Sequence, residues 1–469
     1  MSVDALDFGQ SIAGLLIDGV EETAFAGATL RMDEKLGVRV EVPYVDNAQV
    51  GQFEHVQAWF RDQAPPSNME LATPSGMVSM FDIRWSGHSS GGAVSLGTLA
   101  PNEVVLHERD GPLTEPLVVD EVRSRVDGLR EWTRLTALDT SHELDGEGRV
   151  QRITVTVESP EAVTWQQGAA TMTLRTDWRT SYPEDGAEGG MNILDSTVLT
   201  SRFDSARPFL DHLVEQKKVV NLLVLLFGTG IYFREHRVQH ATFTVRTLDG
   251  VSHGNPFVEL LSSRTIRERL EPMPTRNDFV NGLAGLTAIG PAGLQRWSDE
   301  YTRWERFILP AAGVLGRRGF FQEDIIVSNS QSLEAAGRLL GARDGEAETY
   351  WRGRPTTATY VYRCLHVADL TWSERATSIL HLARAIANTY NDIKHFDRGN
   401  FPEAAASDIS AAATKLLVRA IALQIVDPSN TLHSNGFAGP MWKVSQRFDA
   451  YAVRVDDRGK FVPDPAGNA

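Results

Sequence analysis

The sequence predicts an α+β protein, with a β-rich N-terminal region, built as a sandwich or an open barrel, and an all-helical C-terminal bundle. Up to about residue 203, apolar and polar residues alternate in segments such as 38–42 and 152–158, separated by Gly, Pro, Asn and Asp. This alternation is typical of antiparallel strands that bury one face. From Pro272 onward, apolar residues recur every three or four positions, which is the period of helices.

The chain of 469 residues is too long for one hydrophobic core and predicts several domains. We expect a β-rich acidic region at residues 1–271, divisible near 203, and a helical connector at 272–318. A helical domain follows at 319–427, and a tail with one short helix occupies 428–469.

Residues 115–137 show no clear periodic spacing of apolar residues. A helix is expected at 205–227, ending at Gly228, followed by a further strand at 232–248. The aromatic residues Trp297, Tyr301, Trp304 and Phe307 recur at helical spacing, and such a stripe is more often a packing seam than a surface for stacking bases. Further helices are expected at 320–340, 371–395, from Pro402 to Asp427, and at 441–451, before a mobile polar end.

The charge is unevenly distributed. The whole chain has 46 Lys and Arg against 61 Asp and Glu, a net charge of −15. Residues 293–469 hold 21 basic and 20 acidic residues, which leaves 46 − 21 = 25 basic and 61 − 20 = 41 acidic residues before them. The acidity therefore belongs to the N-terminal part. No basic run of the kind that binds nucleic acid is present.

Several classes of site and location are excluded or disfavoured. The single cysteine, Cys364, leaves no disulfide framework or multi-cysteine zinc site and fits a reducing cytoplasm. The start of the chain does not resemble an export signal, and the most apolar window, residues 219–227, is too short to span a membrane. His236 and His240 have the spacing of a helical metal pair, but the segment reads as a strand and lacks a third ligand. We therefore expect neither a metal nor a cofactor, and a cytoplasmic protein without a membrane partner.

Residues 371–395 carry the most informative pattern, because they read as one helix with two stripes. Thr371 and Glu374 form a potential capping box at its start. The apolar stripe, predicted to face the core, consists of Trp372, Ala376, Ile379, Ala383, Ile386, Tyr390 and Ile393. The polar stripe consists of His381, Arg384, Asn388, Asn391 and His395. Its side chains donate to anions or titrate near neutral pH, which suits phosphate or proton-transfer chemistry.

Two motifs resemble those of a known family. Residues 390–395, YNDIKH, resemble the end of the HEPN motif, and residues 325–340 resemble the helix of Apea-like HEPN domains through Ser330, Leu333, Glu334 and Arg338. Together with the β-rich N-terminal region, the layout is similar to that of the ApeA family of bacterial anti-phage proteins. The helical domain is therefore expected to be HEPN-like.

The resemblance implies a metal-independent RNA endonuclease. His395 would be the general acid or base while the ribose 2′-hydroxyl attacks the phosphate, which suits an imidazole at neutral pH. Asn391, Lys394 and an Arg would stabilise the charged phosphorane. The resemblance further suggests Asn388, Glu334 and Arg338 as substrate-binding residues.

One departure from the HEPN motif concerns its Arg, which should stand four to six residues from the His. Positions 388–390 hold Asn388, Thr389 and Tyr390 instead. Arg384 or Arg398 could supply the charge in a dimer. At about 1.5 Å per residue, Arg384 lies roughly 16 Å from His395 along a helix, too far to grip one phosphate with it.

The expected function is an anti-phage effector that cleaves RNA in abortive infection and is controlled by its acidic N-terminal region. That region either senses a phage component or holds the effector quiet by presenting carboxylates near the polar stripe. The family implies a homodimer or a higher homo-oligomer. One alternative is a non-catalytic HEPN-like module for dimerisation or ligand binding, supported by the missing Arg. Another makes the N-terminal region a carbohydrate-binding or protein-binding module, which exposed aromatics such as Trp59 and Trp85 would favour.

Overall fold

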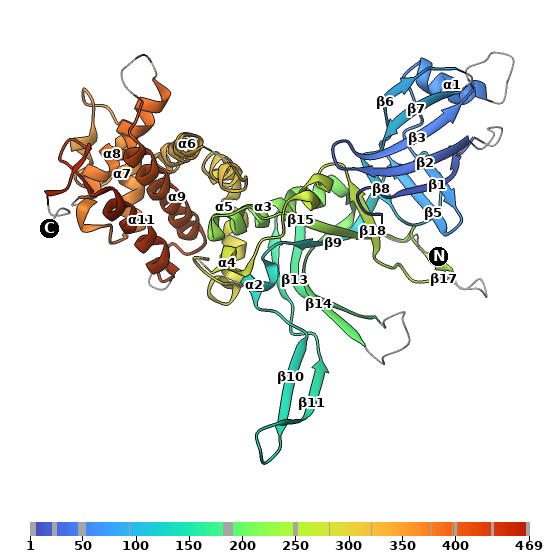
Figure 1. The fold of residues 1–469 in the computed structure, drawn as a ribbon, viewed down its shortest axis with the longest axis horizontal. Coiled ribbons are helices and arrows are strands. Elements are labelled where there is room, and N and C mark those ends of the chain that lie inside the picture. The colour runs from blue at the N-terminus through green and yellow to red at the C-terminus, as the bar shows by residue number, and fades with distance from the viewer. Residues whose placement is uncertain are drawn as a thin grey trace.

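The structure confirms the predicted order of a β-rich N-terminal region and a helical C-terminal region (Figure 1). It is a computed structural model that describes residues 6–20, 26–45, 53–92, 94–181, 191–246, 252–280, 282–319, 321–376, 378–395, 397, 401–432 and 436–465.

Among these residues, fourteen strands form one antiparallel sheet, open at both edges. In spatial order they are β12 Val163–Gln167, β13 Ala170–Ser181, β14 Asn192–Pro208, β9 Val118–Val126, β15 Phe233–Gln239, β18 Val258–Ser262, β8 Glu103–Val105, β5 Gly76–Phe81, β4 Met69–Thr73, β1 Ser11–Ile17, β2 Ala26–Asp33, β3 Gly37–Tyr44, β7 Ser95–Ala100 and β6 Arg84–Ser89. The segment at 115–137, ambiguous in sequence, forms β9 and the short helix α2, Leu129–Thr133.

The part of the sheet formed by the first strands in the sequence encloses its own apolar core, which includes Leu30, Val40, Val78 and Leu99. Helix α1, Glu54–Arg61, packs on it closely, because a Cβ on Gly97 of β7 would lie 2.1 Å from the Phe60 ring. Trp59 is buried in this core and Trp85 packs against it. These two aromatics therefore give no exposed binding face of the kind that a carbohydrate-binding module needs.

Helix α3, Phe209–Phe227, lies on the other part of the sheet and is held there by a buried polar network. Gln216 accepts a hydrogen bond from Ser124 Oγ at 2.5 Å and donates to Ser201 Oγ at 3.0 Å. Ser201 and His212 pair at 3.0 Å. Every member is satisfied, which lets polar groups lie in a core without a large penalty. Gly228, in left-handed conformation at φ 68°, ends α3 as predicted, whereas β14 continues into the predicted first turn.

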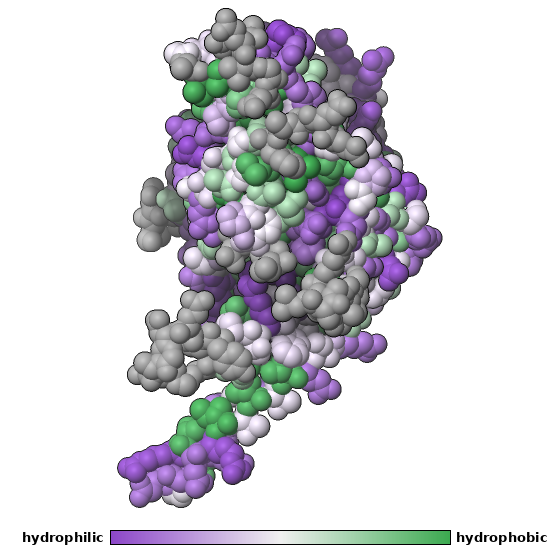
Figure 2. Space-filling model, turned by 90° about the vertical axis from the view of Figure 1, so that its right-hand side faces the viewer, coloured by the Kyte–Doolittle hydropathy of each residue, from purple (hydrophilic) through white to green (hydrophobic). Residues whose placement is uncertain are grey.

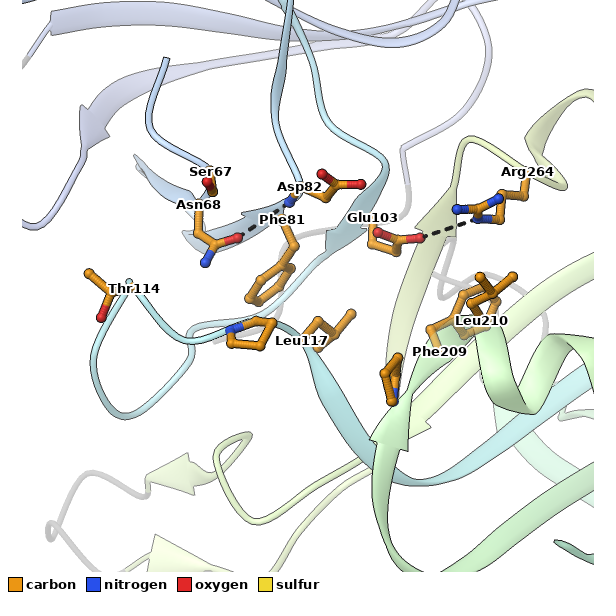
Figure 3. Close-up of a pocket in the computed structure, with 12 residues that line it drawn as sticks. Ser67, Asn68, Phe81, Asp82, Glu103, Thr114, Leu117, Phe209, Leu210 and Arg264 are labelled. Carbon is orange, nitrogen blue, oxygen red and sulfur yellow. Dashed lines mark hydrogen bonds and ion pairs between the residues drawn. The ribbon is translucent and has the colours of Figure 1, made fainter. Parts of the chain in front are cut away.

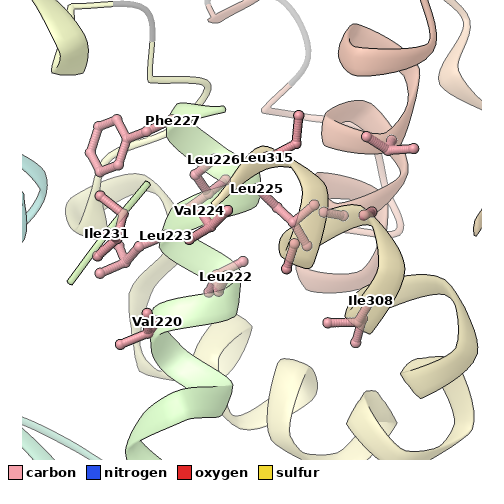
Figure 4. Close-up of a cluster of buried hydrophobic side chains, with 14 of the residues drawn as sticks. Val220, Leu222, Leu223, Val224, Leu225, Leu226, Phe227, Ile231, Ile308 and Leu315 are labelled. Carbon is pink, nitrogen blue, oxygen red and sulfur yellow. The ribbon is translucent and has the colours of Figure 1, made fainter. Parts of the chain in front are cut away.

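The aromatic stripe is a packing seam. Helix α5, Leu286–Leu315, bends at Gly290 and Pro291 and carries Trp297, Tyr301, Trp304 and Phe307, all of them buried. Its apolar face meets α3 in the cluster shown in Figure 4, where Ile308 and Leu315 lie with Leu222 and Leu225. This core continues from the sheet into the C-terminal helices.

The helical region contains α6 Gln322–Leu340, α7 Thr357–Ala368, α8 Ile379–Lys394, α9 Ala404–Val426 and α11 Ala438–Tyr451, with the short α4, Arg276–Phe279, before α5. Helix α9 is apolar and long enough to cross a membrane, but 83% of its apolar window is buried inside the fold. It is the core helix of this region, and it is a longer apolar segment than residues 219–227.

Two expectations about the C-terminal half are wrong. The predicted helix 371–395 is shorter, because a 3₁₀ turn at Glu374–Ala376 precedes α8, whose N-cap is Ser378. Thr371 and Glu374 therefore form no capping box of α8. The polar end is not a mobile tail throughout, since Val453–Val455 and Phe461–Pro463 pair as the hairpin β19–β20.

A two-stranded arm extends from the sheet region (Figure 1). It consists of β10, Leu138–Leu144, and β11, Val150–Val157. Its apolar side chains Leu144, Val150, Ile153 and Val155 are all exposed, and Figure 2 shows the arm standing away from the body.

Candidate functional site

The apolar stripe of α8 packs as predicted. Ala383, Ile386 and Tyr390 are buried, as is Ala376 in the preceding turn. Tyr390 contacts Ile326 of α6 and Ala411 of α9 in a small cluster. The helix is thereby fixed between its neighbours, and the position of its polar stripe follows from this packing.

The middle of the polar stripe is covered by the C-terminal hairpin. Arg384 donates to the backbone carbonyl oxygens of Asp457 at 2.7 Å and Glu348 at 2.6 Å. Asn388 Nδ2 donates to the carbonyl oxygens of Arg458 at 3.2 Å and Gly459 at 3.0 Å. These two side chains therefore hold the chain's own C-terminal hairpin.

The last turn of α8 is arranged differently. His395 is the C-cap residue, its backbone N–H donates to Asn391 O at 2.9 Å, and its side chain is half-buried. Lys394 lies on the surface with its ammonium 3.3 Å from the Tyr390 hydroxyl and 5.3 Å from the ring centroid. Among the described residues, the side chains of Asn391 and His395 have no hydrogen-bond partner. These two side chains therefore differ from Arg384 and Asn388, which both bond the hairpin.

Arg398, the other candidate cation, lies outside the described residues. Arg384 is committed to the hairpin. The structure thus brings together Asn391, Lys394 and His395 within one helical turn and leaves Arg384 and Asn388 upstream of them.

The two substrate-binding candidates on α6 lie at its contact with α7. Glu334 accepts a hydrogen bond from the Thr357 hydroxyl, at the start of α7. Arg338 is exposed, with its guanidinium 5.3 Å from the Tyr360 ring centroid. The helices cross closely here, because a Cβ on Gly337 would lie 2.6 Å from Tyr360. These contacts give both residues a structural role where α6 meets α7.

The connection between α6 and α7 is held by a buried ion pair that the sequence did not reveal. Arg363 donates to both carboxylate oxygens of Glu346, at 2.7 and 2.8 Å. Tyr350 also donates to Glu346. The Arg363 and Tyr350 hydrogen bonds lower the pKa of Glu346 to about 2. The pair fixes the segment to which Arg384 is bonded.

The histidine pair that resembles a metal site lies on and just after β15. His236 is buried and bonds Ser124 Oγ at 2.7 Å and Thr265 Oγ1 at 2.9 Å. Burial lowers its pKa to about 3, so it is neutral. His240 bonds Thr242 at 2.9 Å. No group of three or more metal-ligating side chains occurs in the described ranges.

A second candidate site is a cavity of about 420 Å³ in the sheet region (Figure 3). Phe81, Leu117 and Phe209 form apolar walls, and Glu103 lies 4.0 Å from Arg264. Burial raises the pKa of Glu103 to about 7, against the opposing charge of Arg264. A carboxyl group with so perturbed a pKa in a cavity is a common feature of binding sites. Sequence reasoning missed it, because these residues come from separate segments of the chain, at positions 81, 103, 117, 209 and 264.

Comparison with known proteins identifies the N-terminal part. Residues 57–242 match the family model of ApeA N-terminal domain 1, from within α1 to just beyond β15. The matched segment contains most of the residues that line the cavity around Glu103. No curated protein and no solved structure matches the sequence. The N-terminal part of the chain is thus similar to ApeA N-terminal domain 1.

Proposed function

We propose that this protein is an RNA-cleaving effector of anti-phage defence, with a metal-independent HEPN-type site at the end of α8. His395 acts there as general acid or base, and Asn391 and Lys394 stabilise the charge on the phosphoryl oxygens. The protein acts in the cytoplasm as a homodimer or a higher homo-oligomer. A phage component acts as the trigger and is sensed by the N-terminal region.

The main support for this proposal is the environment of the His395 side chain, in a chain whose N-terminal part matches an ApeA domain. Its imidazole is half-buried at a helix C-terminus and has no partner among the described residues. A histidine that served only to cap its own helix would bond the last carbonyl groups through its ring. Asn391 lies one turn before His395 on α8, and Lys394 directly precedes it.

Arg398 is the better source of the missing positive charge. Arg384 already donates to two carbonyl oxygens and lies about three turns upstream of His395. Recruiting it would release the hairpin from α8. Arg398 follows His395 by only three residues in the sequence.

The same engagement of Arg384 favours an alternative function. Without an Arg that can reach the phosphate, the helical region would be a non-catalytic module for dimerisation or ligand binding. The two proposals predict different effects on RNA integrity when the His395 imidazole is removed.

The test is growth and total-RNA integrity in phage-infected cells that express the wild type, His395→Ala, Arg398→Ala or Arg384→Ala at matched protein levels. The matched control is His366→Ala, which removes an exposed histidine from α7. Loss of general acid–base catalysis should slow RNA cleavage in His395→Ala by about 10²- to 10⁴-fold and abolish protection, and His366→Ala should behave as the wild type.

The outcomes separate the proposals. If His395→Ala still protects cells and RNA stays intact in the wild type as well, the ribonuclease proposal is wrong and the assembly module remains. If Arg398→Ala retains full cleavage while folded Arg384→Ala loses it, the assignment of the cation to Arg398 is wrong.

A further inference from the structure

A second cavity, of about 370 Å³, lies where the N-terminal region meets the C-terminal helices. The end of α3 with Phe227 and helix α4 with Asp278 form one side, and α9 and α11 form the other. Four cationic residues line it: Lys415 and Arg419 from α9, and Lys443 and Arg447 from α11. Such a concentration of positive charge contrasts with the net charge of −15 of the whole chain.

The residues that line this cavity do not neutralise its positive charges. Asp278 is the one carboxylate among the described residues of the lining. It accepts hydrogen bonds from the backbone and hydroxyl of Thr275, at 2.7 and 3.0 Å, to cap α4. Arg447 pairs with Asp408 at 3.0 Å, outside the lining. The side-chain ammonium groups of Lys415 and Lys443 have no hydrogen-bond or ion-pair partner among the described residues.

Arg419 fixes the back of the cavity. It is buried, and its guanidinium donates to the carbonyl oxygens of Leu225 at 3.1 Å and Leu226 at 2.7 Å. Lys415 lies one turn before it on α9. Burial, and then the charges of Arg419, Arg447 and Lys443, lower the pKa of Lys415 to about 8. Bringing these cations together is unfavourable in the empty cavity, and a bound anion would relieve it.

We propose that this cavity binds the phosphate groups of a small phosphorylated ligand of the nucleoside phosphate class. Lysine and arginine side chains together suit phosphate oxygens, and several cations suit a ligand with more than one negative charge. The volume lies within the range of small-ligand pockets, and the Phe227 ring supplies an apolar wall. A single inorganic ion would leave most of this space unfilled.

The position of the cavity gives such a ligand a regulatory role. A ligand gripped by Lys415 and Lys443 on one side and by α3 and α4 on the other stabilises the packing between the two parts of the chain. It thereby shifts the population towards this arrangement in proportion to its differential affinity. The inference does not depend on the ribonuclease proposal, because the cavity is formed by other residues.

The test is calorimetric binding of inorganic phosphate, AMP, ATP and a single-stranded RNA oligonucleotide to the full chain, with the variants Lys443→Ala and Lys415→Met. Lys443 is exposed, so its loss should leave the fold intact. The control is Lys35→Ala, which removes an exposed lysine far from the cavity in sequence. Loss of one charge-assisted contact should weaken nucleotide binding by about tenfold in Lys443→Ala, and Lys35→Ala should bind as the wild type.

A second readout reports on the cavity itself. At about pH 8.5 the bound anion should raise the pKa of Lys415, so that the wild type takes up protons on binding, measured in buffers of different ionisation enthalpy. Lys415→Met should lose this uptake. The proposal is wrong if the wild type binds none of the small phosphates, if it binds only RNA, or if Lys443→Ala and Lys415→Met both bind ATP with unchanged affinity.

Discussion

The guanidinium of Arg384 on α8 donates a hydrogen bond of 2.7 Å to the backbone carbonyl oxygen of Asp457, in the turn of the C-terminal hairpin. Close packing accompanies this bond, since a Cβ on Gly459 would lie 2.4 Å from the Cβ of Arg384. The hairpin thus covers the middle of a helix face that its sequence presents as a continuous polar stripe.

Arg384→Ala should lower the free energy of unfolding by about 1.5–3 kcal/mol, because two carbonyl groups lose a charged donor. Urea denaturation measures this. The control Arg338→Ala removes an arginine with only a ring contact and should change stability by less than about 1 kcal/mol. If both variants are equally stable, the hairpin is not held by Arg384.

Gly337→Ala should destabilise the protein by about 1–3 kcal/mol, although Ala favours helices, because its Cβ would overlap the backbone of Tyr360. Gly313→Ala in α5 has no atom within 4 Å of its added Cβ and should be neutral or stabilising by up to about 1 kcal/mol. Thermal unfolding compares the pair. Equal shifts in melting temperature would contradict the close crossing of α6 and α7.

Arg363→Leu should lower stability by about 3–5 kcal/mol, because it leaves Glu346 buried without its cation. The folded-state pKa of Glu346, about 2, lies below its usual 4.5. Its contribution to stability is therefore complete above about pH 4.5 and is lost as the pH falls towards 2. Acid titration of unfolding should show this loss in the wild type, and the loss should be smaller in Glu346→Gln.

Glu103 should make stability depend on pH in the opposite direction. Its folded-state pKa, about 7, lies above its usual 4.5, so between these values the folded protein binds more protons than the unfolded chain. Stability should therefore fall as the pH rises from about 4.5 to 7, by up to about 3 kcal/mol. Glu103→Gln should remove this fall, measured by urea denaturation at several pH values. Glu143→Gln, on the exposed arm, should leave it unchanged.

The sequence by itself determined the class of the fold and the local rules of its elements. Alternation marked the strands, and the helical period marked the buried face of α8 and the aromatic seam of α5. Gly228 marked the end of α3, because glycine adopts the left-handed conformation there without strain. The resemblance to the ApeA family was read from the motifs at 325–340 and 390–395 together with the β-rich layout, and the family match at 57–242 supports it. These properties depend on neighbours within a few residues.

Tertiary structure alone decided which polar side chains remain available. Arg384 and His395 share one stripe in sequence, yet a hairpin some seventy residues away engages Arg384 and leaves His395 without a partner among the described residues. Glu103 and Arg264 meet, and Asp278 and Lys415 line one cavity, only because distant segments pack together. A side chain's partners and the burial that shifts its pKa are properties of this packing, and no local pattern in the sequence encodes them.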